Sequence, residues 1–206
     1  MTALIILGAA FAGLYGIVTL LSGKTPLFYK ISVYAFCCNL LSVFYSILHR
    51  LLLPDMGGFH VGFFGHAGTF FFLFSSYFGA LDRLADGGEK QYRKYRFTAL
   101  LPSTFILACS FANILLKNGI WRQLLLLPVA ATAYYCCKHL ILPDVEMGII
   151  KVMRPYNAVI LLICLIQPFV LSSAVSAPAP LINAVNAVLT VAALPLAYRG
   201  CRKWFI

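Results

Sequence analysis

The residues best placed for chemistry in this 206-residue sequence are two aspartates, Asp82 and Asp86. Side chains four residues apart share one face of a continuous helix, and two carboxylates on one face can hold a divalent cation together. His139 is a candidate acid or base beside them. The plainer interpretation is that these acids form ion pairs with arginines such as Arg83 and Arg154. The sequence leaves both interpretations open.

The segment that begins at Asp82 reads D-x3-D-G, which can be compared with a known enzyme signature. Enzymes that transfer CDP-activated head groups carry D-x2-D-G-x2-A-R, whereas this chain has one more residue between the aspartates and lacks the Ala-Arg. The GxSG of rhomboid-like serine proteases, the HExxH of zinc proteases and a glycine-rich phosphate loop are also missing. An enzyme acting on lipid head groups through Asp82, Asp86 and His139 is therefore the alternative hypothesis. We expect no cofactor and no metal.

A histidine predicted to lie inside the membrane, His66, is the second chemical candidate. Three glycines surround it, Gly62, Gly65 and Gly68, and the last two have the spacing that lets another helix approach closely. Ionisable side chains at such depth face a bundle interior or a water-filled cavity. His66 therefore either bonds to a neighbouring helix or belongs to a ligand or proton site. Together with polar residues of other predicted spans it makes up the predicted ligand-binding set: Asn39, Ser42, His66, Asn157, Asn183 and Asn186.

The composition places these residues in a membrane protein. Hydrophobic residues are 62% of the chain and charged residues only 11%, against roughly 45–50% and 25% in soluble domains. A chain this short cannot bury so much apolar surface in one core. The net charge of +10 is spread between hydrophobic runs, which indicates loops held at the cytoplasmic surface and no nucleic-acid partner. The seven cysteines show no zinc-ligand spacing, and we expect free thiols.

The hydrophobic runs predict an all-α fold, a polytopic transmembrane bundle in which residues 1–206 form a single domain. A membrane-spanning helix needs about 20 apolar residues. Breaks at glycine, proline and charge clusters predict seven spans, at roughly 2–22, 27–53, 58–81, 97–116, 120–142, 156–173 and 177–198. Of the sixteen basic residues, only Arg50, Lys117 and Arg122 fall on one side of this arrangement. Because basic loops favour the cytoplasm, we predict that the N-terminus is outside and the C-terminus inside.

Two segments of opposite predicted orientation, LLLPDMGG at 51–58 and LILPDVEMG at 140–148, are similar, and a cysteine pair precedes each. Two inverted three-span repeats would produce this similarity. Leu-Pro-Asp as a common way for a chain to leave the membrane would produce it as well. The sequence leaves both interpretations open.

The favoured function is non-enzymatic: the protein binds, senses or transports a small or amphiphilic ligand through a polar pocket inside the bundle. A scaffold or assembly subunit of a membrane complex is a second alternative. We expect the cytoplasmic membrane as its location and either a homo-oligomer or a partner membrane subunit. A basic strip is predicted to contact anionic lipid at the cytoplasmic face, and its residues are Arg83, Lys90, Arg93, Lys94 and Arg96.

Overall fold

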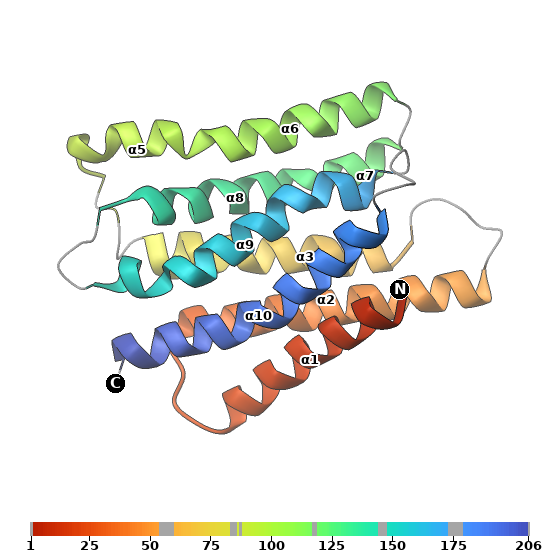
Figure 1. Cartoon of the computed structure of the whole chain (residues 1–206), viewed down its shortest axis with the longest axis horizontal. Helices are drawn as coiled ribbons and strands as arrows, with labels where there is room; N and C mark the ends of the chain where they lie inside the picture. The colour runs from red at the N-terminus through yellow and green to blue at the C-terminus, as the bar shows by residue number, and fades with distance from the viewer. Residues whose placement is uncertain are drawn as a thin grey trace.

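A computed structural model describes residues 2–53, 60–82, 86, 88–116, 119–143, 148–172 and 179–205. Every regular element among these residues is helical, which confirms the predicted all-α class (Figure 1). In chain order the elements are α1 (Thr2–Leu21), α2 (Leu27–Leu52), α3 (Gly62–Ser75), the π-helix η1 (Ser76–Leu81), the 3-10 helix η2 (Lys90–Tyr92), α5 (Arg93–Thr98), α6 (Leu100–Leu115), α7 (Ile120–Leu124), α8 (Leu126–Ile141), α9 (Ile149–Leu171) and α10 (Ala179–Phe205).

Six helical segments of the described residues are long and apolar enough to cross a membrane, which supports a multi-pass membrane protein. They are Ala3–Leu21, Leu27–Leu52, Lys90–Leu115, Ile120–Ile141, Ile150–Leu171 and Pro180–Lys203. The third predicted span, 58–81, corresponds to α3 and η1 and is not among the six.

The long helices form a bundle in which successive helices run in alternate directions (Figure 1). α1 packs against α2 and α10, α2 against α3, α3 against α8, and α9 against both α8 and α10. α6 packs on the outer side of α8. The two chain termini lie at opposite ends of the bundle. We call the end where α2 ends and α3 begins the N-terminal end, and the end where α8 and α10 end the C-terminal end.

α2 and α3 pack closely together, and Gly65 makes that approach possible. A Cβ atom on Gly65 would lie 2.8 Å from the Ser42 backbone nitrogen and 3.0 Å from the Cys38 carbonyl oxygen. The Ser42 hydroxyl donates a hydrogen bond to the Gly62 carbonyl, at 2.7 Å. Small residues let two membrane helices come close enough for such bonds, so the predicted role of Gly65 in helix packing is confirmed.

Prolines explain where two of the helices are interrupted. α5 and α6 are separated at Ala99, three residues before Pro102, and α7 and α8 at Leu125, three residues before Pro128. Proline has no N–H to bond the carbonyl four residues earlier, and its ring crowds that carbonyl. The predicted span 156–173 begins too late, because α9 starts at Ile149 and holds Pro155 inside it. α10 likewise continues beyond 198, to Phe205.

The contact at Gly65 leads to a prediction about stability. Gly65→Ala is expected to lower the free energy of unfolding by about 1–3 kcal/mol, because the added methyl group overpacks against backbone atoms of α2. Gly79→Ala is the matched control, since a Cβ there meets nothing within 4 Å and alanine favours helix by about 0.5–1 kcal/mol. Thermal unfolding of the purified variants measures the difference, and equal melting temperatures would contradict this packing.

Candidate functional site

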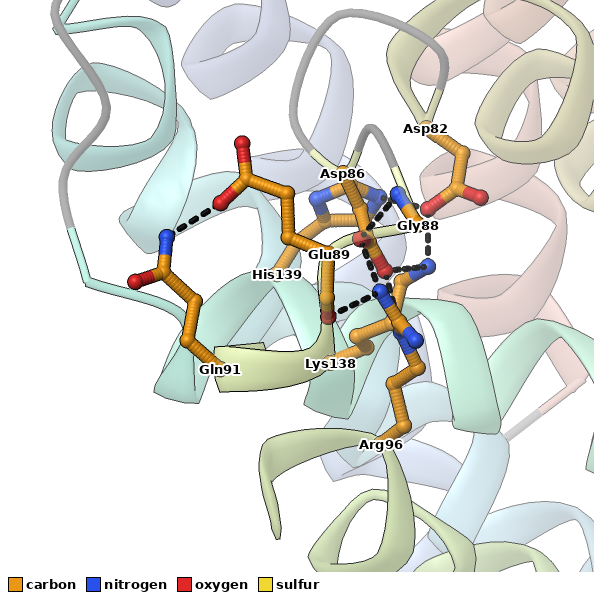
Figure 2. A network of polar contacts seen from close by, with 8 residues as sticks. All are labelled: Asp82, Asp86, Gly88, Glu89, Gln91, Arg96, Lys138 and His139. Atoms are coloured by element: carbon orange, nitrogen blue, oxygen red, sulfur yellow. Dashed lines mark hydrogen bonds and ion pairs between the residues drawn. The ribbon is translucent and has the colours of Figure 1, made fainter. Parts of the chain in front are cut away.

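Acidic and basic side chains meet at the C-terminal end in what we call the rim cluster: Asp82, Asp86, Arg96, Lys138 and His139 (Figure 2). Arg96 binds Asp86 with two parallel hydrogen bonds, Nε to Oδ2 at 2.8 Å and Nη2 to Oδ1 at 2.6 Å. The same guanidinium donates to the Glu89 carbonyl at 3.0 Å. A bidentate arginine–carboxylate pair fixes both side chains in position. The start of α5 is thereby fixed to the segment that follows η1.

Lys138 of α8 joins the two aspartates. Its Nζ is 3.1 Å from Asp86 Oδ2 and is also ion-paired with Asp82 Oδ1. His139 Nε2 is 3.4 Å from the same Asp82 oxygen, and the His139 ring stacks on Tyr77 with the centroids 5.8 Å apart. Lys138 is only 3% exposed and His139 is fully buried. A buried lysine needs carboxylate partners, and here it has two.

The two carboxylates are held ionised. Asp86 accepts hydrogen bonds from Arg96, and these hold the pKa of the Asp86 carboxyl well below its usual range, although burial opposes the shift. Burial also acts to raise the pKa of Asp82, but contacts with His139 and Lys138 outweigh it and the pKa is lowered overall. Two ionised acids thus face the basic side chains of Arg96 and Lys138. The rim cluster is internally neutralised.

This arrangement tests the predicted partners of the acids. Asp82, Asp86 and His139 do lie close together. The basic residues that pair with the two acids are Lys138 and Arg96. The sequence had suggested Arg83 and Arg154 as partners. Arg154 instead donates to the Leu142 carbonyl at 3.3 Å, and Arg83 lies outside the described residues. No group of three His, Cys, Asp or Glu side chains in the described part of the chain could hold a metal ion. The carboxylates are occupied by cations of the protein itself.

The predicted basic strip is divided by this cluster. Arg96 is bound to Asp86, so it is not a free surface charge. Lys90, Arg93 and Lys94 are exposed, and Arg93 lies over the Phe97 ring with its Cζ 5.6 Å from the centroid. Three residues of the predicted strip therefore remain exposed at this surface.

At the opposite end, a cavity of about 630 Å³ lies between α2, α3, α9 and α10, and we call it the central cavity. Ile5 of α1 and Arg122 of α7 complete its wall. Phe36 and Arg50 of α2 mark its two ends, about 21 Å apart along the helix at 1.5 Å per residue. Five of the six predicted ligand-binding residues line it: Asn39, Ser42, His66, Asn183 and Asn186.

The middle of the central cavity is polar, and part of that polarity is unpaired. Gln167 donates to the Asn186 side-chain oxygen at 3.4 Å. Asn39 and Asn183 are partly exposed and line it, and the buried Nε2 of His66 has no hydrogen-bond partner among the described residues. Unpaired polar groups within a bundle are costly unless water or a ligand reaches them. These residues therefore offer hydrogen bonds to whatever enters.

The floor of the central cavity is apolar and closed. Phe36, Phe70, Leu73 and Ile163 are all at least 94% buried there. Beyond the floor, towards the rim cluster, Phe28, Tyr77 and Tyr156 pack together, with Phe28 edge-on to both tyrosines and the two tyrosines stacked. We call these three side chains the aromatic layer.

Asn157, the sixth predicted ligand residue, does not line the central cavity. It is fully buried, and its side-chain oxygen accepts a hydrogen bond from the Tyr77 hydroxyl at 2.9 Å. Helical periodicity gave no sign of this, because the contact joins residues far apart in the chain. Asn157 supports the aromatic layer.

Sequence reasoning missed the residues at the mouth of the central cavity: His49, Arg50, His60 and Arg122. Arg50 and Arg122 are two of the three basic residues on the predicted outer side of the membrane. Because basic residues are scarce there, these two could have been identified from the sequence as candidates. The His49 and His60 rings stack with centroids 4.5 Å apart, and Arg122 lies over the Phe63 ring at 5.5 Å. The mouth is cationic.

The rim cluster provides a second stability prediction. Lys138→Met leaves the Asp82 carboxylate with His139 alone, and removing one partner of a buried ion pair costs about 3–5 kcal/mol. The exposed Lys94→Met is the control and should change the melting temperature little. Adding Asp82→Asn to Lys138→Met should recover part of the loss in thermal unfolding. An unchanged melting temperature in Lys138→Met would contradict the role of the cluster.

Comparison with known proteins identifies no family for this chain. No protein-family profile, curated protein or solved structure matches the chain. The functional assignment rests on the two sites themselves, an internally neutralised cluster at the C-terminal end and a polar cavity with a cationic mouth at the N-terminal end.

Proposed function

We propose that the protein binds a small or amphiphilic ligand in the central cavity, in order to transport it or to sense it for a partner protein. The observation that carries the proposal is that α2, α3, α9 and α10 together line a cavity with polar side chains, among them the unpaired buried Nε2 of His66. Its volume of about 630 Å³ is within the range of small-molecule sites, about 300–1,000 Å³. A bundle that served only as a scaffold would gain nothing from unpaired polar groups at this depth.

The shape of the site favours transport. The mouth reaches the surface at Arg50 and Leu53, both exposed, whereas the floor is sealed by the aromatic layer and, beyond it, by the rim cluster. A carrier that alternates between two sides needs one open and one closed end at a time. An open mouth and ion-paired opposite end fit the state that takes up ligand from the N-terminal side.

The enzyme alternative has less support. Asp82, Asp86 and His139 line none of the central cavity, and both acids already pair with Lys138 or Arg96. An acid–base or metal mechanism needs carboxylates that a substrate or ion can reach. The rim cluster is better suited to holding helices together.

We further propose seven spans, with the N-terminus outside and the C-terminus inside the cytoplasmic membrane. The alternating helix directions support α3 with η1 as the span beyond the six that are long and apolar enough by themselves (Figure 1). The basic residues concentrated at the C-terminal end support the orientation. Lys90, Arg93 and Lys94 would then contact the anionic inner leaflet, each contributing about 1 kcal/mol.

Filling the central cavity tests the binding function. Asn39→Phe introduces a large ring beside Ser42 and is expected to reduce the amount of co-purifying small molecule by about tenfold, equivalent to about 1.4 kcal/mol of binding free energy. Leu41→Phe is the matched control, since Leu41 is 52% exposed on the outer face of the same helix. Untargeted mass spectrometry of protein released from mild detergent measures the bound molecules.

Two results of that measurement would count against the proposal. One is that no molecule co-purifies with the wild type above the level found with Asn39→Phe. The other is that Leu41→Phe reduces the bound molecule as much as Asn39→Phe does, which would place the molecule in the surrounding lipid.

The orientation is tested with reporters at the two termini. Alkaline phosphatase, active only outside the cytoplasmic membrane, is expected to be active when fused to the N-terminus. Green fluorescent protein, which folds in the cytoplasm, is expected to fluoresce when fused to the C-terminus. An even number of spans would place both reporters on one face, and the seven-span topology would then be wrong.

A further inference from the structure

We infer that the ligand of the central cavity is an organic anion, whose charged group is held at the mouth by Arg50, Arg122 and His60. The inference rests on the proposed function and adds the chemical class of the ligand. It starts from the fact that the mouth gathers basic side chains from α2, the start of α3 and α7 in one place.

The basic residues at the mouth lie close to one another. The His49 and His60 rings are stacked at 4.5 Å, and both line the central cavity with Arg50 and Arg122. Phe63 links two of them, because its ring packs on His60 at 4.4 Å and lies under the Arg122 guanidinium at 5.5 Å. Residues that are distant in the sequence are thereby brought to a single opening.

No carboxylate lines the central cavity in the described part of the chain. The acids that the structure describes, Asp82, Asp86 and Glu89, all lie at the opposite end, around the rim cluster (Figure 2). Like charges held together beside a low-dielectric interior repel one another. A bound anion removes that repulsion, so the mouth selects for negative charge.

The donor chemistry at the mouth suits a carboxylate or a phosphate group. A guanidinium presents paired N–H donors that match two oxygens of either group. His60 Nδ1 accepts a hydrogen bond from the Gly62 backbone nitrogen at 3.1 Å, which assigns the ring proton to Nε2 in the neutral form. His60 therefore donates a hydrogen bond in either protonation state.

The residues that line the rest of the central cavity indicate the polarity of the rest of the ligand. Below the mouth, Asn39, His66 and Asn183 offer hydrogen bonds, and the floor beyond them is apolar. The fitting molecule has an anionic group at one end, a polar group part-way along and an apolar far end. A free organic anion and an anionic lipid from the surrounding leaflet share this chemistry, and the experiment must separate them.

The test uses the full chain in nanodiscs of neutral phosphatidylcholine, with dodecyl phosphate as the anionic probe and dodecanol as its uncharged counterpart. Native mass spectrometry counts the molecules that remain on the protein. Dodecyl phosphate is expected to saturate at one per protein and to bind at least about tenfold more tightly than dodecanol, because hydrogen bonds to charged groups contribute that much or more. Asn39→Phe should abolish this saturable binding.

Single arginine changes identify the mouth as the source of the charge preference. Arg50→Gln and Arg122→Gln should each weaken dodecyl phosphate binding about tenfold and leave dodecanol unchanged. The exposed Arg199→Gln, at the C-terminal end, is the matched control and should change neither. If either mouth variant fails to fold, rising salt should still weaken dodecyl phosphate binding to the wild type, because ions screen the exposed mouth charges.

The outcomes separate this inference from the proposed function. If dodecanol binds in a cavity-dependent way as tightly as dodecyl phosphate, the ligand class is wrong and the binding function stands. If neither probe responds to Asn39→Phe, while an unrelated molecule co-purifies in an Asn39-dependent way, the inference fails alone. If no molecule of any kind depends on Asn39, both fail.

Asp55, a carboxylate outside the described residues, supplies one more control. If Asp55→Asn prefers dodecyl phosphate to dodecanol and the wild type does not, the Asp55 carboxylate already neutralises the mouth. That result overturns the inference.

The source of the anion is decided by changing the disc. Nanodiscs that contain phosphatidylglycerol, with no free amphiphile added, should yield one retained phosphatidylglycerol per protein if the ligand is a membrane lipid. If dodecyl phosphate binds and phosphatidylglycerol is not retained, the ligand is a free organic anion. Retention of neither anion by the wild type overturns the inference.

Discussion

The constraint on which this structure depends is that a polar group inside a membrane-spanning bundle has no bulk water to bind. It must find a partner in the protein or open onto a wet cavity. At the C-terminal end the first solution is used, since the almost completely buried Lys138 forms ion pairs with Asp82 and Asp86. At the N-terminal end the second is used, because Asn39 and Asn183 face the central cavity.

The contact between α2 and α3 links the central cavity to the rim cluster. Gly65 lets the backbone of α3 approach Ser42, and the Ser42 hydroxyl then reaches the Gly62 carbonyl. This close contact holds α3 against α2 along one side, so that His66 and Asn39 border the same space. The same helix ends in η1, whose wide π-helical turn carries Tyr77 into the aromatic layer. One helix thus contributes to the cavity wall, the layer that closes it and, through Asp82, the rim cluster.

The functional groups follow one axis through the bundle. A cationic mouth is followed by a polar middle, an apolar floor, the aromatic layer and finally the neutralised rim cluster. Within the described residues, Asp82 and Asp86 pair with Arg96 and Lys138 in the rim cluster, whereas no described carboxylate lines the mouth. This asymmetry supports the proposed entry of a ligand from the N-terminal side. Moving a ligand onward would require Phe28, Tyr77 and Tyr156 to separate and the ion pairs of Lys138 to rearrange.

The sequence by itself determined the membrane class, the helical fold and most of the helix boundaries, because hydrophobic run length, glycine and proline act locally along the chain. It also indicated Asn39, Ser42, His66, Asn183 and Asn186, since polar residues within apolar runs are conspicuous. Only the tertiary structure decided that Asn157 bonds to Tyr77, that Lys138 and Arg96 pair with the acids, and that Arg50 and Arg122 meet at one opening. Those contacts join helices distant in sequence, and which faces meet is decided by packing, which no local pattern records.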